Sequence, residues 1–213
     1  MNCPHCSSQI SPAQPVCLQC GFSAVAIRGY LGADWVKLAR ITDNAQLLSL
    51  KHTRHLETVL DDFERRFPQC FMAAYIGALP EALTLPDLGF WLINHGAFQT
   101  HQISRRNDFG IVLMIDPVRQ QACLTLGYGL EAVLKEPALT HILKKLQPLL
   151  TKGSFAATIE SAVRLIEKEL QSAARREPRQ LDQPPSVIGD ASDLGLHTLR
   201  SPTRPLLHAP KAH

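Results

Sequence analysis

Several features that would assign a function directly are missing from this sequence. No uninterrupted apolar stretch reaches the ~18 residues that a membrane-spanning helix needs. No lysine or arginine precedes Arg28, and the formal net charge of the chain is only +3. A concentrated basic patch, the usual footprint of tight nucleic-acid binding, is therefore absent. The chain also has no Gly-x-Ser-x-Gly elbow and no glycine-rich phosphate loop ending in Lys-Ser or Lys-Thr. We expect no membrane span, and nucleic acid is not the expected partner.

Cysteine is concentrated at the beginning of the chain. Cys3 and Cys6 form one Cys-x-x-Cys pair, and Cys17 and Cys20 form another. Two such pairs at this separation can place four thiolates at the corners of a tetrahedron, which is the geometry that Zn²⁺ accepts in closed structural sites. The pattern therefore predicts a structural Zn²⁺ held by these four side chains.

The position of the first cysteine bears on the compartment. A metal ligand at Cys3 leaves no room before it for a charged segment followed by an apolar one, so we expect no secretory signal. The protein is then expected in the cytoplasm. In that reducing compartment a four-cysteine pattern indicates zinc and not disulfides.

The composition divides the chain into four parts. Residues 1–23 are the predicted zinc ribbon, which is too small to fold without its metal. Residues 24–40 form a connector with a short strand expected around Ala24–Ile27. Residues 41–170 are predicted to form one α/β domain. Residues 171–213 are rich in proline, lack periodicity, and are predicted to be a disordered tail.

Within residues 41–170, apolar periodicity and breaker residues predict alternating helices and strands. The expected helices run from Thr42 or Asp43 to about Phe67, from Pro86 to about His95, and over Pro137–Leu150 and Phe155–Leu170. The expected strands are Cys70–Ile76, Ile111–Ile115 and Ala122–Leu126, the last two joined as a hairpin. This order predicts an α/β fold with a small sheet of three to four strands sandwiched by helices.

One block of sequence carries a family resemblance. Asn107-Asp108-Phe109-Gly110 precedes an apolar strand, and the strand after the hairpin runs into Gly127-Tyr128-Gly129-Leu130-Glu131. This combination resembles the TPM domain, the family of thylakoid acid phosphatase and photosystem II repair proteins and of many bacterial proteins. Ile41-Thr42-Asp43-Asn44-Ala45 resembles the opening of the same domain. The resemblance covers residues 41–170 and implies an α/β/α fold. Many relatives carry a signal peptide and a C-terminal membrane helix, and we expect neither in this chain.

The resemblance also implies a divalent-cation site for Ca²⁺ or Mg²⁺. The matching acidic positions are Asp43, Asp108 and Glu131. Asp108 precedes one strand and Glu131 follows its antiparallel neighbour, so both are expected at the same edge of the sheet. The alternative is that the three have local roles: Asp43 caps a helix, Asp108 makes a turn, and Glu131 lies in the first turn of a helix.

Other candidate sites have ordinary explanations. Cys70 and Cys123 lie in apolar strand sequence and are expected to be core thiols. His52 and His55 could share a helix face as a metal pair, but a solvent-exposed polar face is the commoner arrangement. Gly127-x-Gly129 matches part of a dinucleotide fingerprint but lacks its βαβ context, so a tight turn is favoured.

Two functions follow as hypotheses. The first is a cytoplasmic adaptor in which a zinc ribbon and a TPM-like domain bind a protein partner, with or without a divalent cation. The second is a weak divalent-metal-dependent phosphatase acting on phosphomonoesters. The sequence contains no recognisable nucleophile that would decide whether the protein is an enzyme.

Overall fold

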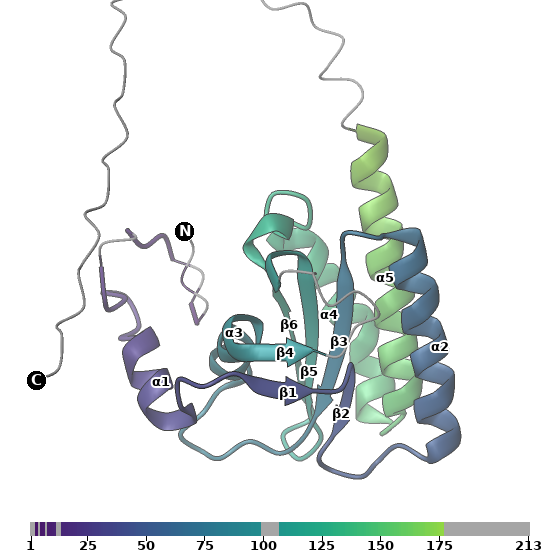
Figure 1. The fold of residues 1–213 in the computed structure, drawn as a ribbon, viewed down its shortest axis with the longest axis horizontal. Helices are drawn as coiled ribbons and strands as arrows, with labels where there is room; N and C mark the ends of the chain where they lie inside the picture. The colour runs from purple at the N-terminus through teal and green to yellow at the C-terminus, as the bar shows by residue number, and fades with distance from the viewer. Residues whose placement is uncertain (1–2, 4, 7, 12–13, 99–106, 177–213) are drawn as a thin grey trace, which may run out of the picture.

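The computed structural model describes residues 3, 5–6, 8–11, 14–98 and 107–176. In chain order the elements are α1 (Ala24–Leu31), β1 (Val36–Leu38), β2 (Ile41–Asp43), α2 (Leu50–Arg66), β3 (Phe71–Ile76), α3 (Leu85–His95), β4 (Gly96–Phe98), the 3₁₀ turn η1 (Asn107–Phe109), β5 (Gly110–Asp116), β6 (Gln121–Leu126), the 3₁₀ turn η2 (Tyr128–Leu130), α4 (Glu136–Thr151) and α5 (Phe155–Arg176). Figure 1 shows that the sheet lies between α3 on one side and α2, α4 and α5 on the other.

The main sheet has the strand order β2-β3-β5-β6. The first three strands are parallel, and β6 pairs antiparallel with β5 through the predicted hairpin. Every residue of β5 is buried, as a central strand covered on both faces requires. A second, two-stranded parallel sheet pairs β1 with β4. The predicted α/β fold with a sheet of up to four strands sandwiched by helices is therefore confirmed.

The sheet separates two apolar cores. The larger core packs α2, α4 and α5 against one face, with Leu56, Leu60 and Phe63 repeating at helical spacing along α2. The smaller core lies on the α3 side and combines Val112 and Met114 from β5 with Leu88 and other residues of α3. The segment before residue 41 also contributes to this smaller core, through Ile27, Leu31 and Leu38 among others. That segment is thus packed against the domain.

Two predictions about local structure were wrong. Residues 24–27, expected as a strand, begin α1, because the Ser23 hydroxyl caps the helix by accepting a hydrogen bond from the Ala26 amide. Thr42 and Asp43, expected as a helix start, belong to strand β2. The helix begins seven residues later at Leu50, where Ser49 caps it through the His52 amide. The helix start was assigned to Thr42 or Asp43 because these residues, like Ser49, have a side-chain oxygen that can accept a hydrogen bond from the backbone.

The remaining predicted elements of the domain agree with the structure. The hairpin strands, α3 and α4 match the expected ranges to within one or two residues. Helix α5 continues to Arg176, past the predicted beginning of the tail. Residues 177–213, which hold the rest of that tail, lie outside the described residues. No helix in the described part of the chain is long and apolar enough to span a membrane.

A buried ion-pair cluster ties the chain before β2 to α2. The Arg40 guanidinium is 7% exposed and contacts Glu57 at 2.5 Å, Asp61 at 2.7 Å and Glu64 at 3.3 Å. These carboxylates are spaced four and three residues apart and so share one face of α2. Burial disfavours the charged guanidinium, but the carboxylates outweigh it and raise the Arg40 pKa.

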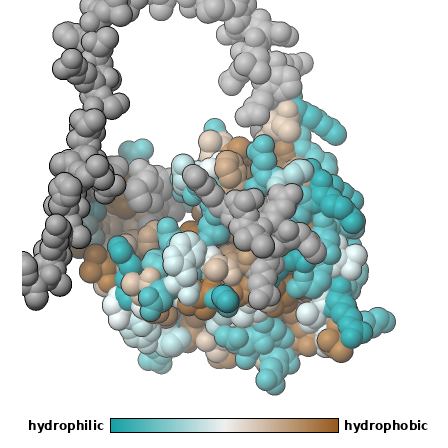
Figure 2. Space-filling view, viewed as in Figure 1, coloured by the Kyte–Doolittle hydropathy of each residue, from teal (hydrophilic) through white to brown (hydrophobic). Residues whose placement is uncertain are grey.

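The outer side of the molecule over α2 and α5 is predominantly hydrophilic in Figure 2.

Candidate functional site

The four N-terminal cysteines converge on one point. Their sulfur atoms all lie within 4.8 Å of one another. Cys3 Sγ is 3.6 Å from Cys20 Sγ, and Cys6 Sγ is 3.7 Å from Cys17 Sγ. Cys3 and Cys17 are buried, whereas Cys20 is exposed. Among the described residues, this is the one group of three or more His, Cys, Asp and Glu side chains placed to hold a metal ion.

The geometry of this cluster fits zinc. A tetrahedral zinc site with Zn–S bonds of about 2.3 Å has sulfur–sulfur edges of about 3.8 Å. The Cys3–Cys20 separation of 3.6 Å and the Cys6–Cys17 separation of 3.7 Å are close to that edge. They are also far longer than a covalent sulfur–sulfur bond of about 2.0 Å, and all six cysteines of the chain are free thiols.

The electrostatics of the cluster favour a bound metal cation. Hydrogen bonding to the Ser8 hydroxyl and backbone lowers the pKa of the Cys6 thiol to about 6. The backbone at Phe22 favours the Cys20 thiolate, but desolvation and the neighbouring sulfur atoms of Cys6 and Cys3 outweigh it and raise the pKa of Cys20 to about 12. The Cys6 thiolate thus forms readily, whereas ionisation of Cys20 beside it is disfavoured. A bound dication would neutralise that charge and stabilise all four thiolates.

Backbone hydrogen bonds hold both cysteine pairs in place. The Cys3 amide donates to the Ser8 carbonyl at 2.8 Å, and the Cys17 amide donates to the Phe22 carbonyl at 2.8 Å. Gly21 follows the second pair with a φ of 76°, a left-handed conformation that glycine adopts without strain. The chain therefore reverses immediately after Cys20 and brings Phe22 back beside Cys17.

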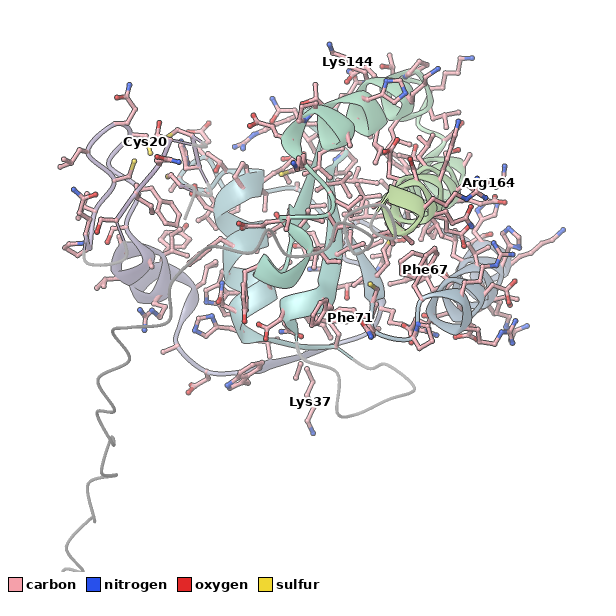
Figure 3. The ribbon with its side chains drawn as sticks, turned by 90° about the horizontal axis from the view of Figure 1, so that it is seen from above. Cys20, Lys37, Phe67, Phe71, Lys144 and Arg164 are labelled. Atoms are coloured by element: carbon pink, nitrogen blue, oxygen red, sulfur yellow. The ribbon has the colours of Figure 1, made fainter. Side chains whose placement is uncertain are left out.

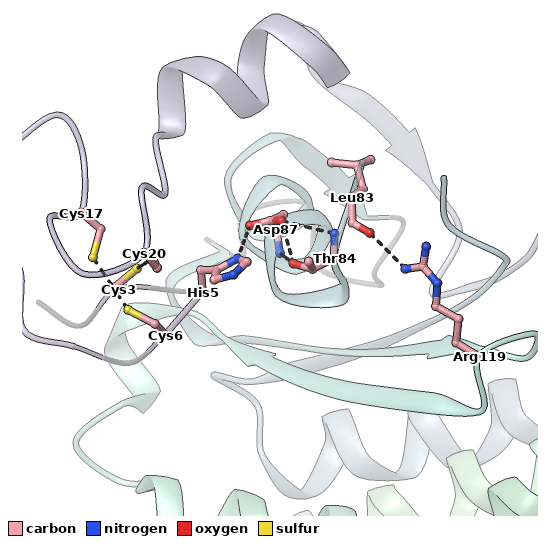
Figure 4. A network of polar contacts seen from close by, with 9 residues as sticks. All are labelled: Cys3, His5, Cys6, Cys17, Cys20, Leu83, Thr84, Asp87 and Arg119. Carbon is pink, nitrogen blue, oxygen red and sulfur yellow. Dashed lines mark hydrogen bonds and ion pairs between the residues drawn. The ribbon is translucent and has the colours of Figure 1, made fainter. Parts of the chain in front are cut away.

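The cysteine module, by which we mean the described residues from Cys3 to Ser23, is attached to α3 (Figure 4). His5 Nδ1 lies 3.1 Å from Asp87 Oδ1. The other carboxylate oxygen of Asp87 accepts from the Thr84 amide and hydroxyl. The Thr84 hydroxyl oxygen accepts in turn from the Asp87 amide, which completes a capping box at the start of α3. The Phe22 ring meets the Phe90 ring edge-on at 5.2 Å between centroids. In Figure 3, Cys20 lies on the α1 and α3 side, away from Arg164 on α5.

The second candidate region is the family block, formed by η1 before β5 and η2 after β6. Gly127 lies so close to η1 that an added Cβ atom would be 2.1 Å from the Asn107 carbonyl oxygen. The Gly127 amide donates to the Gly110 carbonyl at 2.8 Å, and the Asn107 side-chain amide donates to the Gly96 carbonyl at 2.8 Å. Tyr128, between Gly127 and Gly129, is 73% exposed. The block consists of two 3₁₀ turns in close contact, in line with the tight turn expected from the sequence.

The three acidic candidates lie at two different places. Asp108 in η1 and Glu131 directly after η2 are at the end of the sheet where β5 begins and β6 ends, as expected. Asp43 ends β2 and is level with Ile76 and Ile115 across the parallel strands. It is therefore about 16 Å along the strands from the Asp108 end. Asp43 Oδ2 accepts from the Leu48 amide at 2.7 Å, while its buried Oδ1 has no hydrogen-bond partner within the described chain.

The remaining candidates are two histidines on α2 and two cysteines. His52 is exposed, and His55 Nε2 lies 3.4 Å from Glu160 Oε2 on α5. Cys70 is buried and Cys123 half-buried, and burial raises the pKa of the Cys123 thiol. Both agree with the expected core thiols.

Sequence reasoning missed the contact between His5 and Asp87. Thr84-Leu85-Pro86-Asp87 has the spacing of a capping box and could have been recognised. The contact of Asp87 with His5 could not have been recognised, because the two residues are separated by 82 positions along the chain. Arg119 extends this network by donating to the Leu83 carbonyl at 3.2 Å (Figure 4).

The family-model comparison matches the domain, and its match begins after the cysteine module. A family model described as the TPM domain matches residues 41–169. The solution NMR structure of the N-terminal domain of a protein from P. gingivalis is similar, with a TM-score of 0.50 and 20% sequence identity. The similarity covers 64% of this chain and 84% of that one, and at this identity it concerns the fold. No curated protein shows significant similarity to this chain.

Proposed function

Because this chain belongs to the TPM domain family and carries a four-cysteine cluster ahead of that domain, we propose that it is a protein-binding adaptor with a structural zinc ion. The observation that supports the proposal best is the surface of the cysteine module. Residues 1–27 contain no Asp, Glu, Lys or Arg. Yet Leu18, between the second pair of cysteines, is 86% exposed, and Val25 on the adjoining α1 is 66% exposed.

An uncharged surface with projecting apolar side chains suits a protein partner better than a nucleic acid. Nucleic-acid binding relies on lysine and arginine contacts to phosphate, which this module lacks. Protein interfaces bury apolar anchors at their centre, and charged residues are depleted there. Zinc would make the module rigid, so its anchors would be presented in a fixed arrangement before binding.

Affinity capture with matched variants tests the adaptor proposal. The zinc-loaded chain is used as bait beside Leu18→Ser, and Val118→Ser is the control because Val118 is 77% exposed on the β5–β6 turn. We expect a partner that both the wild type and Val118→Ser retain. With purified components, Leu18→Ser should bind that partner at least about tenfold more weakly. Equal binding by both variants, or no partner of the wild type, would refute the proposal.

A second function, divalent-metal-dependent hydrolysis of phosphomonoesters, is supported by the shared position of Asp108 and Glu131 at one end of the sheet. These two carboxylates would hold the cation, which when bound polarises a phosphoryl oxygen and activates water. Asp43 is at the opposite end of the sheet and has no place in this proposal.

Hydrolysis of a generic phosphomonoester by the full chain tests the second function. Turnover should require added Ca²⁺, Mg²⁺ or Mn²⁺, and it should be lost in Asp108→Ala and in Glu131→Ala. Asp62→Ala is a suitable control, because Asp62 is an exposed carboxylate on α2. Turnover that both site variants retain would exclude these residues, and no turnover above blank with any of the three cations would contradict the enzyme hypothesis.

A further inference from the structure

Both halves of the cysteine module contact α3. From the first cysteine pair, His5 reaches Asp87, whose side chain is 12% exposed. From the second pair, Phe22 reaches Phe90, and Phe22 is itself hydrogen-bonded through its carbonyl to the Cys17 amide. Asp87 and Phe90 are three residues apart on α3, so they lie on the same face of the helix. The module thus docks on one face of α3 through two anchors, one from each cysteine pair.

The chain that follows the module is packed on the same helix. Ile27 of α1 is 8% exposed and belongs to the smaller core together with Leu88 and Trp91 of α3. The indole N–H of Trp91 donates to the Gly32 carbonyl, directly after α1, at 2.8 Å. Trp91 is 6% exposed. The segment that directly follows the module therefore helps to bury Trp91.

The relative position of the two anchors depends on the four sulfur atoms. His5 lies inside the first cysteine pair, and Phe22 lies two residues after the second. The sulfur contacts that connect the pairs are Cys3 with Cys20 and Cys6 with Cys17. A metal bonded to all four sulfurs would fix this arrangement, whereas four free thiols have only weak mutual contacts. Fixing two anchors in advance reduces the entropy lost when both dock.

We propose that metal binding at the four cysteines controls the docking of the cysteine module and α1 on α3. This inference rests on the metal site of the proposed function and extends it: the metal-loaded module is part of the domain, and loss of metal releases it. Release uncovers Phe90 and the buried face around Trp91. By linkage, docking must strengthen metal binding by the same factor by which metal strengthens docking.

Tryptophan fluorescence tests the release directly. The chain has two tryptophans, and Trp35→Phe leaves Trp91 as the single reporter. Zn²⁺ is removed with a chelator while its release is followed by a colorimetric zinc indicator, and Zn²⁺ is then added back. We expect the Trp91 emission to shift to longer wavelength as zinc leaves and to return when zinc is restored. Zinc release with unchanged emission would overturn the inference and leave the metal site standing. Failure to bind zinc at all would overturn both.

A variant outside the metal ligands tests the linkage. Phe22→Ala removes one anchor, so we expect zinc affinity to fall by about fivefold, the worth of one aromatic pair. Phe67→Ala is the matched control, because Phe67 pairs with Phe63 at the end of α2, on the opposite side of the sheet from α3. Circular dichroism checks that both variants remain folded. Equal zinc affinity in the wild type and Phe22→Ala would show that docking and metal binding are independent, which contradicts the inference.

Discussion

Gly127 lies where the two turns of the family block approach each other closely. The backbone of Asn107 and Asp108 occupies the space where any larger residue would place its Cβ. Backbone atoms cannot move aside as the end of a flexible side chain can, so substitution must displace one turn from the other. The glycines of the Gly-Tyr-Gly-Leu-Glu sequence are therefore explained by packing, and nothing in this arrangement requires a nucleotide.

Gly127→Ala is accordingly expected to lower the free energy of unfolding by about 2 kcal/mol, measured by urea denaturation. Gly29→Ala is the control, because Gly29 lies within α1 and an added Cβ meets nothing within 4 Å. That change should be neutral or stabilise the protein by about 0.5–1 kcal/mol. Equal stability of Gly127→Ala and the wild type would mean that the two turns are not packed as described.

Arg40 is the other residue whose removal should be costly. Arg40→Met removes the guanidinium that pairs with Glu64, which is 4% exposed, and with the partly buried Glu57 and Asp61. Breaking a buried ion pair from one side typically costs ~3 kcal/mol or more, because the remaining charge stays desolvated. Arg65→Met removes an exposed guanidinium paired with Asp62 and should cost less than about 0.5 kcal/mol. Urea denaturation of both variants measures these losses. Similar losses in the free energy of unfolding for the two variants would contradict this account.

At the scale of elements, the packing of α2 against α5 includes polar contacts at the rim of the larger core. Arg66 on α2 binds Glu167 on α5, and His55 contacts Glu160. Glu160 also accepts a hydrogen bond from Arg164 one turn along α5. Burial opposes ionisation of Glu160, but the hydrogen bonds from Arg164 and His55 outweigh it and lower the pKa of the Glu160 carboxyl.

This lowered pKa predicts a pH dependence of stability. A carboxyl whose pKa is depressed by folding stabilises the protein above its unfolded pKa and loses that effect as pH falls through the folded pKa. Glu160→Gln should therefore reduce stability near pH 7, and the difference from the wild type should shrink toward about pH 3. Glu169→Gln on the same helix is the control, since the described structure gives Glu169 no ion pair. Urea denaturation at both pH values checks this, and a difference that does not change with pH would contradict it.

The elements that could be predicted from sequence are those with a long apolar period or a clear breaker. Helix α3, both hairpin strands and the last two helices belong to this class, and so does the α/β arrangement. Strands β1, β2 and β4 have only three residues each, too few for a period of two to be recognised. Their pairing is non-local, as for Ile41 with Ala74, and depends on packing that a single sequence does not display.

The candidate sites follow the same division. The cysteine cluster could be predicted because the spacing of its ligands is itself the signal for a metal site. The position of Asp43 relative to Asp108 could not, because it depends on β2 being parallel to β3 and β5. Strand direction places two acids that match one family pattern at opposite ends of the sheet.

At the scale of the whole molecule, the protein is a TPM domain extended on its α3 side by α1 and the cysteine module. The α2 and α5 side is covered by charged residues, whereas the added module is uncharged and exposes Leu18. The two sides of the sheet thus differ in what they can bind. On this account a bound metal orders the cysteine module, and both partner binding and the docking of the module on α3 depend on that metal.

Intact and native mass spectrometry of the purified full chain tests this central claim most directly. The account predicts one zinc ion per chain in the native spectrum, together with a denatured mass that corresponds to reduced cysteines. The zinc should be lost in a Cys3→Ser, Cys17→Ser double variant and retained in a Cys70→Ser variant. A native chain without metal, or a denatured mass lowered by disulfide formation among these cysteines, would contradict the account.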